Sequence, residues 1–245
     1  MKIAPSAHPT WVKDFLNDIE PYENRILDGD CFGKMSRGEL PLDTFRHIML
    51  DFYPLVESFP KYMALILSRI PMENNDKCNM ARYWLIENLN IERKHADWYR
   101  DWICAFGVPR EVMDKEVFPC PEVDAVNNFL WKICTYGTIP EAIAGLNFSI
   151  EGPTGKWAKS VYKNISKYKN MEGVVLDVKS TMWLKAHARY DDHHPEEALE
   201  IIKAFALNEE EQERVRRAAI NAMTYYAMAS QASYKMGSQN SISAA

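Results

Sequence analysis

Apolar residues recur along most of this chain at intervals of three and four, the spacing of one face of an α-helix. Alternation of apolar and polar residues, which is typical of half-buried strands, is rare. Asp28-Gly29 is the one dipeptide that could turn a hairpin, and no alternating strand follows it. Only ten glycines interrupt the 245 residues. The pattern predicts an all-α protein.

Prolines, glycines and capping residues divide this pattern into separate helices. We expect helices from about Thr10 to Leu27, near Leu42 to Arg69 with a bend or break at Pro54 and Pro60, and from the cap cluster Asn74-Asn75-Asp76 to Cys104 or Ala105. Another should start after Pro121, be interrupted near Gly137 to Pro140, and resume from Glu141 to Ile150 with an end at Gly152-Pro153. Further helices should run from about Gly155 to Tyr168, from about Gly173 to His193, from Pro195 to Ala206, and from near Asn208 to about Lys235. No shift in composition marks a domain boundary. Residues 1–235 are therefore expected to form one domain, and the small polar residues 236–245 a flexible tail.

Composition and charge narrow the class of protein. Hydrophobic residues make up 47% and charged residues 26%, which is typical of a globular domain and not of a disordered chain. The net charge of −5 does not favour binding to nucleic acid or to an anionic membrane. No uncharged apolar run reaches the roughly 18 residues of a membrane span, and the first residues lack the apolar core of a signal peptide. The five cysteines are scattered without a C-x-x-C pair, which favours reduced thiols and a cytoplasmic location.

Two short motifs carry most of the candidate chemistry. Glu92 and His95 form an E-x-x-H pair, and His187, Asp191 and His194 follow the pattern H-x-x-x-D-x-x-H. Residues three or four apart share one face of a helix, so each motif can present its side chains to a single ion. Either motif alone has an ordinary explanation as a surface pair, and Pro195 disfavours helical geometry at His194.

Two glutamates in otherwise apolar stretches extend the pattern. Helical bundles build di-iron centres from single glutamates on two helices and a Glu-x-x-His pair on each of two others. Imidazoles with carboxylates suit iron or manganese better than a structural zinc, which more often uses thiolates. The charge of four carboxylates, those of Glu57, Glu92, Glu151 and Asp191, would balance the charge of two divalent ions. The predicted ligands are Glu57, Glu92, His95, Glu151, His187, Asp191 and His194.

Four segments resemble the haem-oxygenase-like di-metal oxidases, a grouping that includes the TenA thiaminases and PqqC. They are YPLVESFPKYMA (53–64), MARYWLIENLNIERKHADWY (80–99), NFSIEGPTGKW (147–157) and WLKAHARYDDHHPEEALEII (183–202). Within the grouping, the closest likeness is to UndA-type decarboxylases, which convert medium-chain fatty acids to terminal alkenes. The likeness covers about residues 50–205.

The resemblance implies a haem-oxygenase-like bundle of about seven or eight helices that holds no haem. It also implies two Fe(II) ions per chain, with manganese as the alternative metal, and O₂ as co-substrate. Six of the predicted ligands match the ligand set of the family, namely Glu92, His95, Glu151, His187, Asp191 and His194. Glu57 matches an additional carboxylate that some members have.

We therefore expect a non-haem oxidase acting on a small carboxylate, with decarboxylation of a medium-chain fatty acid as one version. An amino-acid-cleaving oxidase or a p-aminobenzoate-synthase-like enzyme is an alternative. That synthase branch has a glutamate seven residues before the histidine, where this chain has Asn88. A non-catalytic metal- or partner-binding protein on the same scaffold, and a ferritin-like iron-handling protein, also remain open. The sequence is compatible with a homodimer.

Overall fold

The structure is a computed structural model that describes residues 3–190 and 194–243. Within these residues the chain forms twelve α-helices and no strand, so the all-α prediction is confirmed. The helices are α1 (Thr10–Leu27), α2 (Asp30–Arg37), α3 (Leu42–Arg69), α4 (Asp76–Glu92), α5 (His95–Ala105), α6 (Arg110–Met113), α7 (Pro121–Tyr136), α8 (Ile139–Ile143), α9 (Glu151–Asn164), α10 (Met182–Tyr190), α11 (His194–Phe205) and α12 (Glu209–Ser243).

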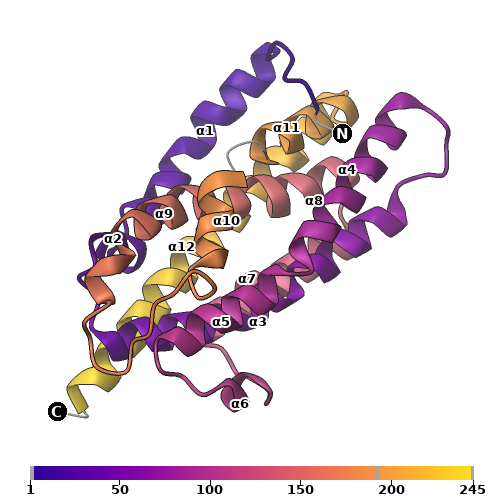
Figure 1. Cartoon of the computed structure of the whole chain (residues 1–245). Coiled ribbons are helices and arrows are strands. Elements are labelled where there is room, and N and C mark those ends of the chain that lie inside the picture. Colours follow the sequence, from indigo (N-terminus) through magenta and orange to yellow (C-terminus); the bar gives the residue numbers. More distant parts are fainter. Residues whose placement is uncertain (1–2, 191–193, 244–245) are drawn as a thin grey trace.

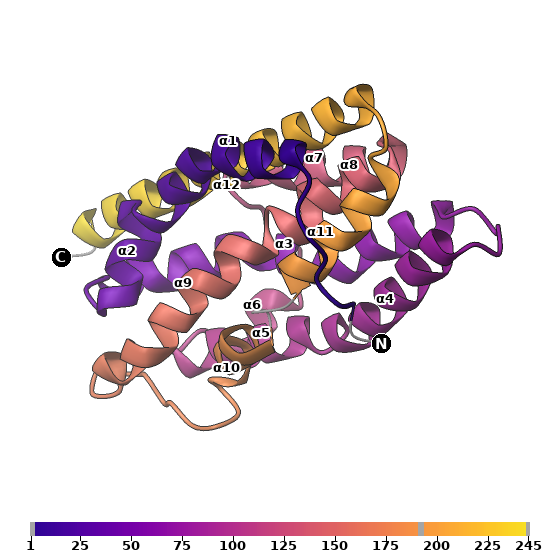
Figure 2. The same ribbon diagram turned by 90° about the horizontal axis from the view of Figure 1, so that it is seen from above.

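The two longest helices, α3 and α12, pack against each other and organise the bundle. Helices α1 and α12 run side by side along one edge, and α4 and α5 lie on the opposite side (Figures 1 and 2). Helices α9 and α11 lie between these two layers (Figure 2). In the described part of the chain, no helix has both the length and the apolar character needed to cross a membrane.

Helix α3 continues through Pro54 and Pro60 without the break that these residues could have caused. A proline inside a helix removes a backbone hydrogen bond and crowds the preceding turn. Buried side chains at a spacing of seven, such as Phe45, Phe52 and Phe59, hold this helix in the core along its length. Tertiary packing of this apolar face therefore outweighs the local cost of the prolines.

The expected helix from Asp76 to Ala105 is divided at residues 93–94 into α4 and α5, so that prediction was wrong. At the division, the backbone N–H of Lys94 donates to the carbonyl of Ile91 at 3.1 Å, which tightens the chain into a turn. No glycine or proline lies at this point. Glu92 becomes the last residue of α4, and His95 becomes the first residue of α5.

The segment around Gly152-Pro153 begins a helix, whereas the sequence pattern predicted that one would end there. Pro153 lies in the first turn of α9, where backbone N–H groups have no partner within the helix and a proline costs little. A π-helical segment, Ala144–Phe148, precedes α9. In it, the N–H of Ser149 donates to the carbonyl of Ala144 at 3.1 Å.

Other boundaries also differ from the prediction. Helices α2 and α6 were not predicted, and together with the division between α4 and α5 they explain why the bundle has more helices than expected. Helix α10 begins at Met182 instead of near Gly173. Helix α12 extends to Ser243, so residues 236–243 are helical and the expected tail does not begin at residue 236.

Candidate metal centre

Five of the seven predicted ligands lie buried in the interior of the bundle. They are Glu92, His95, Glu151, His187 and His194, with exposed fractions of 5%, 2%, 5%, 6% and 8%. They come from the end of α4, the start of α5, the start of α9, the middle of α10 and the start of α11. Ionisable side chains are rarely buried to this extent unless they are paired or bind metal.

The division between α4 and α5 brings the first motif together. Oε2 of Glu92 lies 2.8 Å from Nδ1 of His95. The imidazole of His95 in turn lies beside that of His187, with 4.7 Å between the ring centroids. The first motif and the last motif, far apart in the sequence, are therefore neighbours.

The backbone of α10 orients His187. Its Nδ1 lies 2.9 Å from the carbonyl oxygen of Trp183, one turn earlier. A carbonyl can only accept, so Nδ1 carries the hydrogen and Nε2 of the neutral ring has the lone pair. A metal-binding histidine is commonly oriented by such a hydrogen bond from its other ring nitrogen. The indole of Trp183 also packs on this imidazole, with ring centroids 3.8 Å apart.

Glu151 is held by an amide that the sequence analysis did not single out. Nδ2 of Asn147 donates to Oε1 of Glu151 at 2.9 Å, and both side chains are buried. The other carboxylate oxygen, Oε2, lies 3.6 Å from Nδ1 of His194. Asn147 lies four residues before Glu151, and this spacing was the one available signal of its role.

The three histidines change the acidity of Glu92. Burial alone would raise the pKa of this carboxyl, but the neighbouring His95, together with His187 and His194, outweighs burial and lowers the pKa below its usual value. The carboxylate is therefore held in its anionic form, which is the form that binds a metal ion.

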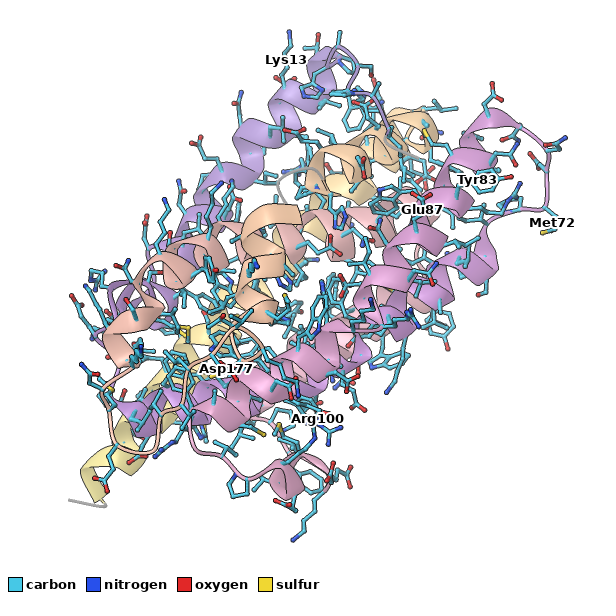
Figure 3. All side chains as sticks on the ribbon, viewed as in Figure 1. Lys13, Met72, Tyr83, Glu87, Arg100 and Asp177 are labelled. Carbon is cyan, nitrogen blue, oxygen red and sulfur yellow. The ribbon has the colours of Figure 1, made fainter. Side chains whose placement is uncertain are left out.

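The remaining two predicted ligands, Asp191 and Glu57, are not part of this buried group in the described residues. Asp191 lies outside the described residues. Glu57 is half-exposed, 3.9 Å from Lys61, and lines a separate hollow on the exterior, so the structure does not bring it to the other five. Glu87, which shares α4 with Glu92, lies on the exposed face of that helix together with Tyr83 (Figure 3). In residues 3–190 and 194–243, no three donor side chains converge into a complete metal-binding group.

A largely apolar cavity adjoins these side chains. Its wall includes Glu92, His95, Glu151 and His187, and its free volume is about 60 Å³. The rest of the wall is formed mainly by Phe32, Met35, Ile48, Met49, Phe52, Leu55, Val56, Phe59, Tyr99, Trp102, Trp157, Trp183 and Tyr226. The phenol of Tyr226 shares a hydrogen bond with Thr154 at 3.0 Å and accepts one from the indole of Trp157 at 2.9 Å. Four of the five buried candidate ligands therefore face a largely apolar space.

The donor set fits iron. Three imidazoles and two carboxylates from five elements supply the nitrogen and oxygen donors typical of non-haem iron, and no cysteine lines the adjoining cavity. Residues 46–227 match a family described as iron-containing redox enzymes. This chain belongs to that family. The match covers most of the chain and contains all seven predicted ligands.

Relatives and solved structures agree with this assignment. The 4-aminobenzoate synthase of Chlamydia trachomatis is 25% identical over 158 residues, which are 62% of this chain and 64% of that protein. The 4-aminobenzoate synthase of Chlamydia muridarum is 25% identical over 163 residues, 63% of this chain and 65% of that protein. The matched region thus spans just under two-thirds of the length of these relatives.

The fold is shared with solved TenA-like structures. A TenA homologue from Pseudomonas syringae is 28% identical, with a TM-score of 0.83 over 94% of this chain and 98% of that one. A domain with a haem-oxygenase-like fold from Shewanella denitrificans is 16% identical, with a TM-score of 0.74 over 94% of each chain. The haem-oxygenase-like fold is therefore confirmed, and the closer likeness to UndA-type decarboxylases stays a prediction.

Replacing Asn147 with leucine is expected to weaken iron binding. The substitution keeps the size of the side chain but removes its hydrogen bond to Glu151. Loss of such a supporting partner typically costs about 10–100-fold in metal affinity. Titration of Fe(II) against a competing chelator would measure the change. Asn164→Leu is the matched control, because Asn164 bonds to the backbone of Ser36 away from the site. Equal affinities in the two variants would contradict the role of Asn147.

Proposed function

We propose that this protein is an Fe(II)- and O₂-dependent oxidase with a two-iron centre that oxidises a small carboxylate. The observation that carries the proposal is the burial of five iron-type donors, four of which line an apolar cavity. Membership in a family of iron-containing redox enzymes supports the iron. The number of two metals rests on the pattern of seven residues in the sequence. Five of these residues form the buried cluster, whereas Glu57 lies apart from it and Asp191 is outside the described residues.

The lining of the cavity supports a carboxylate that binds the metal directly. Among the described residues, neither lysine nor arginine lines this cavity. A buried carboxylate needs a compensating charge or hydrogen bonds, and a metal bound by the candidate ligands would supply that charge. The apolar wall away from the candidate ligands disfavours a charged group at the far end of the substrate.

The residues have separate roles in this proposal. Glu92 and His95 would hold one metal, and Glu151 and His194 the other, with His187 between them beside His95. When bound, iron would supply O₂ reduction and a template for the substrate. The carbonyl of Trp183 keeps the proton of His187 on Nδ1, and Asn147 keeps the carboxylate of Glu151 oriented. Aromatic side chains exclude water from the reacting end of the substrate.

The size of the cavity restricts the substrate. A free volume of about 60 Å³ has room for only a few non-hydrogen atoms, since one water needs roughly 10–15 Å³. A medium-chain fatty acid, the substrate of the decarboxylating version, would require side chains to move. Met35 and Met49 in the wall are the side chains best able to do so, because methionine is flexible.

Anaerobic titration with Fe(II), followed by exposure to O₂, tests the proposal. We expect the protein to bind about two Fe(II) ions per chain, the number held by di-iron sites of carboxylates and histidines in helical bundles. The iron-loaded protein should then consume O₂ with a transient visible absorption. Screening small carboxylic acids in air by mass spectrometry would identify the product. Iron binding without O₂ uptake would favour a non-catalytic metal-binding protein, and absence of iron binding would refute the proposal.

Formation of 4-aminobenzoate is a second candidate function, because the two chlamydial relatives are 4-aminobenzoate synthases. The p-aminobenzoate synthase that this chain resembles consumes one of its own tyrosines. Among the described residues, the tyrosines that line the cavity are Tyr99 and Tyr226. Asn88, where that branch has a glutamate, is buried on α4 one turn before Glu92. Intact-protein mass spectrometry after exposure to Fe(II) and O₂ separates the candidates, since only the second predicts loss of mass from the chain and release of 4-aminobenzoate.

A further inference from the structure

Aromatic rings form a continuous column through two of the candidate iron ligands. The ring of Trp98 lies 5.3 Å from that of His95, and His95 lies 4.7 Å from His187. His187 lies 3.8 Å from Trp183, which stacks on Trp102 at 5.3 Å with 15° between the planes. Each imidazole of the column therefore has an indole beside it.

Helix geometry produces this column. His95 and Trp98 are three residues apart on α5, and Trp183 and His187 are four apart on α10, so each pair shares one face of its helix. Helices α5 and α10 pack against each other, which brings the two pairs together. The order of the rings is thus set by rigid elements and not by loops.

The two ends of the column differ in their access to solvent. Trp183 and Trp102 are buried, with 3% and 1% of their surfaces exposed, whereas Trp98 is only half-buried. Two exposed cations, Arg93 and Lys94, precede Trp98 in the turn between α4 and α5. The residue directly before Trp98, Asp97, is an exposed carboxylate, so the charge beside the Trp98 end is mixed. A small molecule from solution can approach this end of the column, whereas the Trp102 end is buried.

The proposed oxidation needs electrons from outside the protein. Reduction of O₂ to two waters takes four electrons, and a substrate oxidised by one bond, as in loss of CO₂ and a β-hydrogen, supplies two of them. The other two must come from a reductant in each turnover. An iron centre enclosed by the bundle needs a route by which they enter.

We propose that Trp98 is the residue through which these electrons enter, delivered by a small one-electron reductant of the ascorbate class. The inference rests on the proposed function. In each transfer the donor would lose one electron, and the indole of Trp98 would relay this electron to the imidazole of His95, which would pass it to iron held there. Trp98 ends unchanged, no atom is transferred, and two such transfers complete a turnover. Trp98 is a relay and does not touch substrate.

Reduction of the iron by ascorbate tests the role of Trp98 without enzyme turnover. The iron-loaded protein is oxidised, freed of O₂ and substrate, and mixed with ascorbate while the ferric absorbance is followed by stopped flow. Trp98→Phe should slow reduction about tenfold, equivalent to roughly 1.4 kcal/mol in the barrier. Trp98→Tyr, which keeps an oxidisable ring, should recover part of the rate. Trp131→Phe is the matched control, because Trp131 is also half-buried but packs on Tyr62.

Two further measurements distinguish a relay from a structural role. The iron content and the reduction potential should be the same in Trp98→Phe as in the unchanged protein, because only the rate depends on a relay. If Trp98→Phe does not fold, Trp98→Leu takes its place. Equal reduction rates in protein that binds iron and consumes O₂ would overturn this inference alone. Failure to bind iron would overturn the proposed function as well.

Discussion

Replacing His187 with alanine is expected to abolish iron binding. His187 is buried beside His95, and its hydrogen bond to the carbonyl of Trp183 leaves Nε2 as the donor for a metal. Loss of a partner that only supports a ligand already costs about 10–100-fold in affinity, so loss of the ligand itself should cost more than this. Measurement of iron content after desalting, together with an Fe(II) titration, would check the result.

Two further variants test whether iron is lost because a ligand is missing, and not because packing changes or because any histidine is removed. His187→Phe keeps a ring on Trp183 but has no nitrogen, so it should lose iron as completely as His187→Ala. His8→Ala removes an exposed histidine that is far from His187 in the sequence, and this variant should bind iron normally. Retention of iron at the normal stoichiometry in His187→Phe would contradict a ligand role for His187.

Replacing Gly145 with alanine is expected to destabilise the fold and to weaken iron binding together. Gly145 lies in the π-helical segment that leads to Glu151, and a Cβ there would collide with Cδ1 of Ile133 on α7. Overpacking of this kind typically costs about 1–3 kcal/mol. Displacement of the segment would also move Asn147 and Glu151. Chemical denaturation and Fe(II) titration would measure the two effects.

A second substitution tests whether that collision is the cause. Ile133→Val removes Cδ1 and should by itself cost about 0.5–1.5 kcal/mol. In the double variant the cavity left by valine accepts the new methyl group, so the combined destabilisation should be smaller than the sum of the two single changes. Additive losses would show that Gly145 is required for another reason.

Several helices could be predicted closely. The bounds of α1 and α3 agree with those expected from their apolar spacing and, for α1, from Pro9 before it. Helix α7 begins at Pro121 itself and not after it, because proline is suited to the first turn of a helix. Where local signals and burial agree, the sequence alone is sufficient.

Other boundaries depended on contacts that the sequence does not display. Nothing at residues 93–94 signals the division between α4 and α5, and Gly152-Pro153 has the composition of a helix end although it begins one. Glu57 is spaced like a ligand and lies in an apolar stretch, yet it sits on the exposed face of α3, because the direction of a side chain depends on how the helix is rotated in the bundle. The roles proposed for Asn147 and Trp98 follow from their contacts with Glu151 and His95, which only the structure shows.

The sequence by itself determined the helical class and the type of chemistry, because the period of the apolar residues and the spacing of glutamates and histidines are local properties. It therefore predicted the all-α class and most of the buried donors, including Glu92, His95 and Glu151. The haem-oxygenase-like fold was predicted from the resemblance of four segments to a known family. Only the tertiary structure decided which donors meet, which cavity they face and which rings adjoin them. Such contacts join segments far apart in the chain, and they depend on packing between helices that no local pattern records.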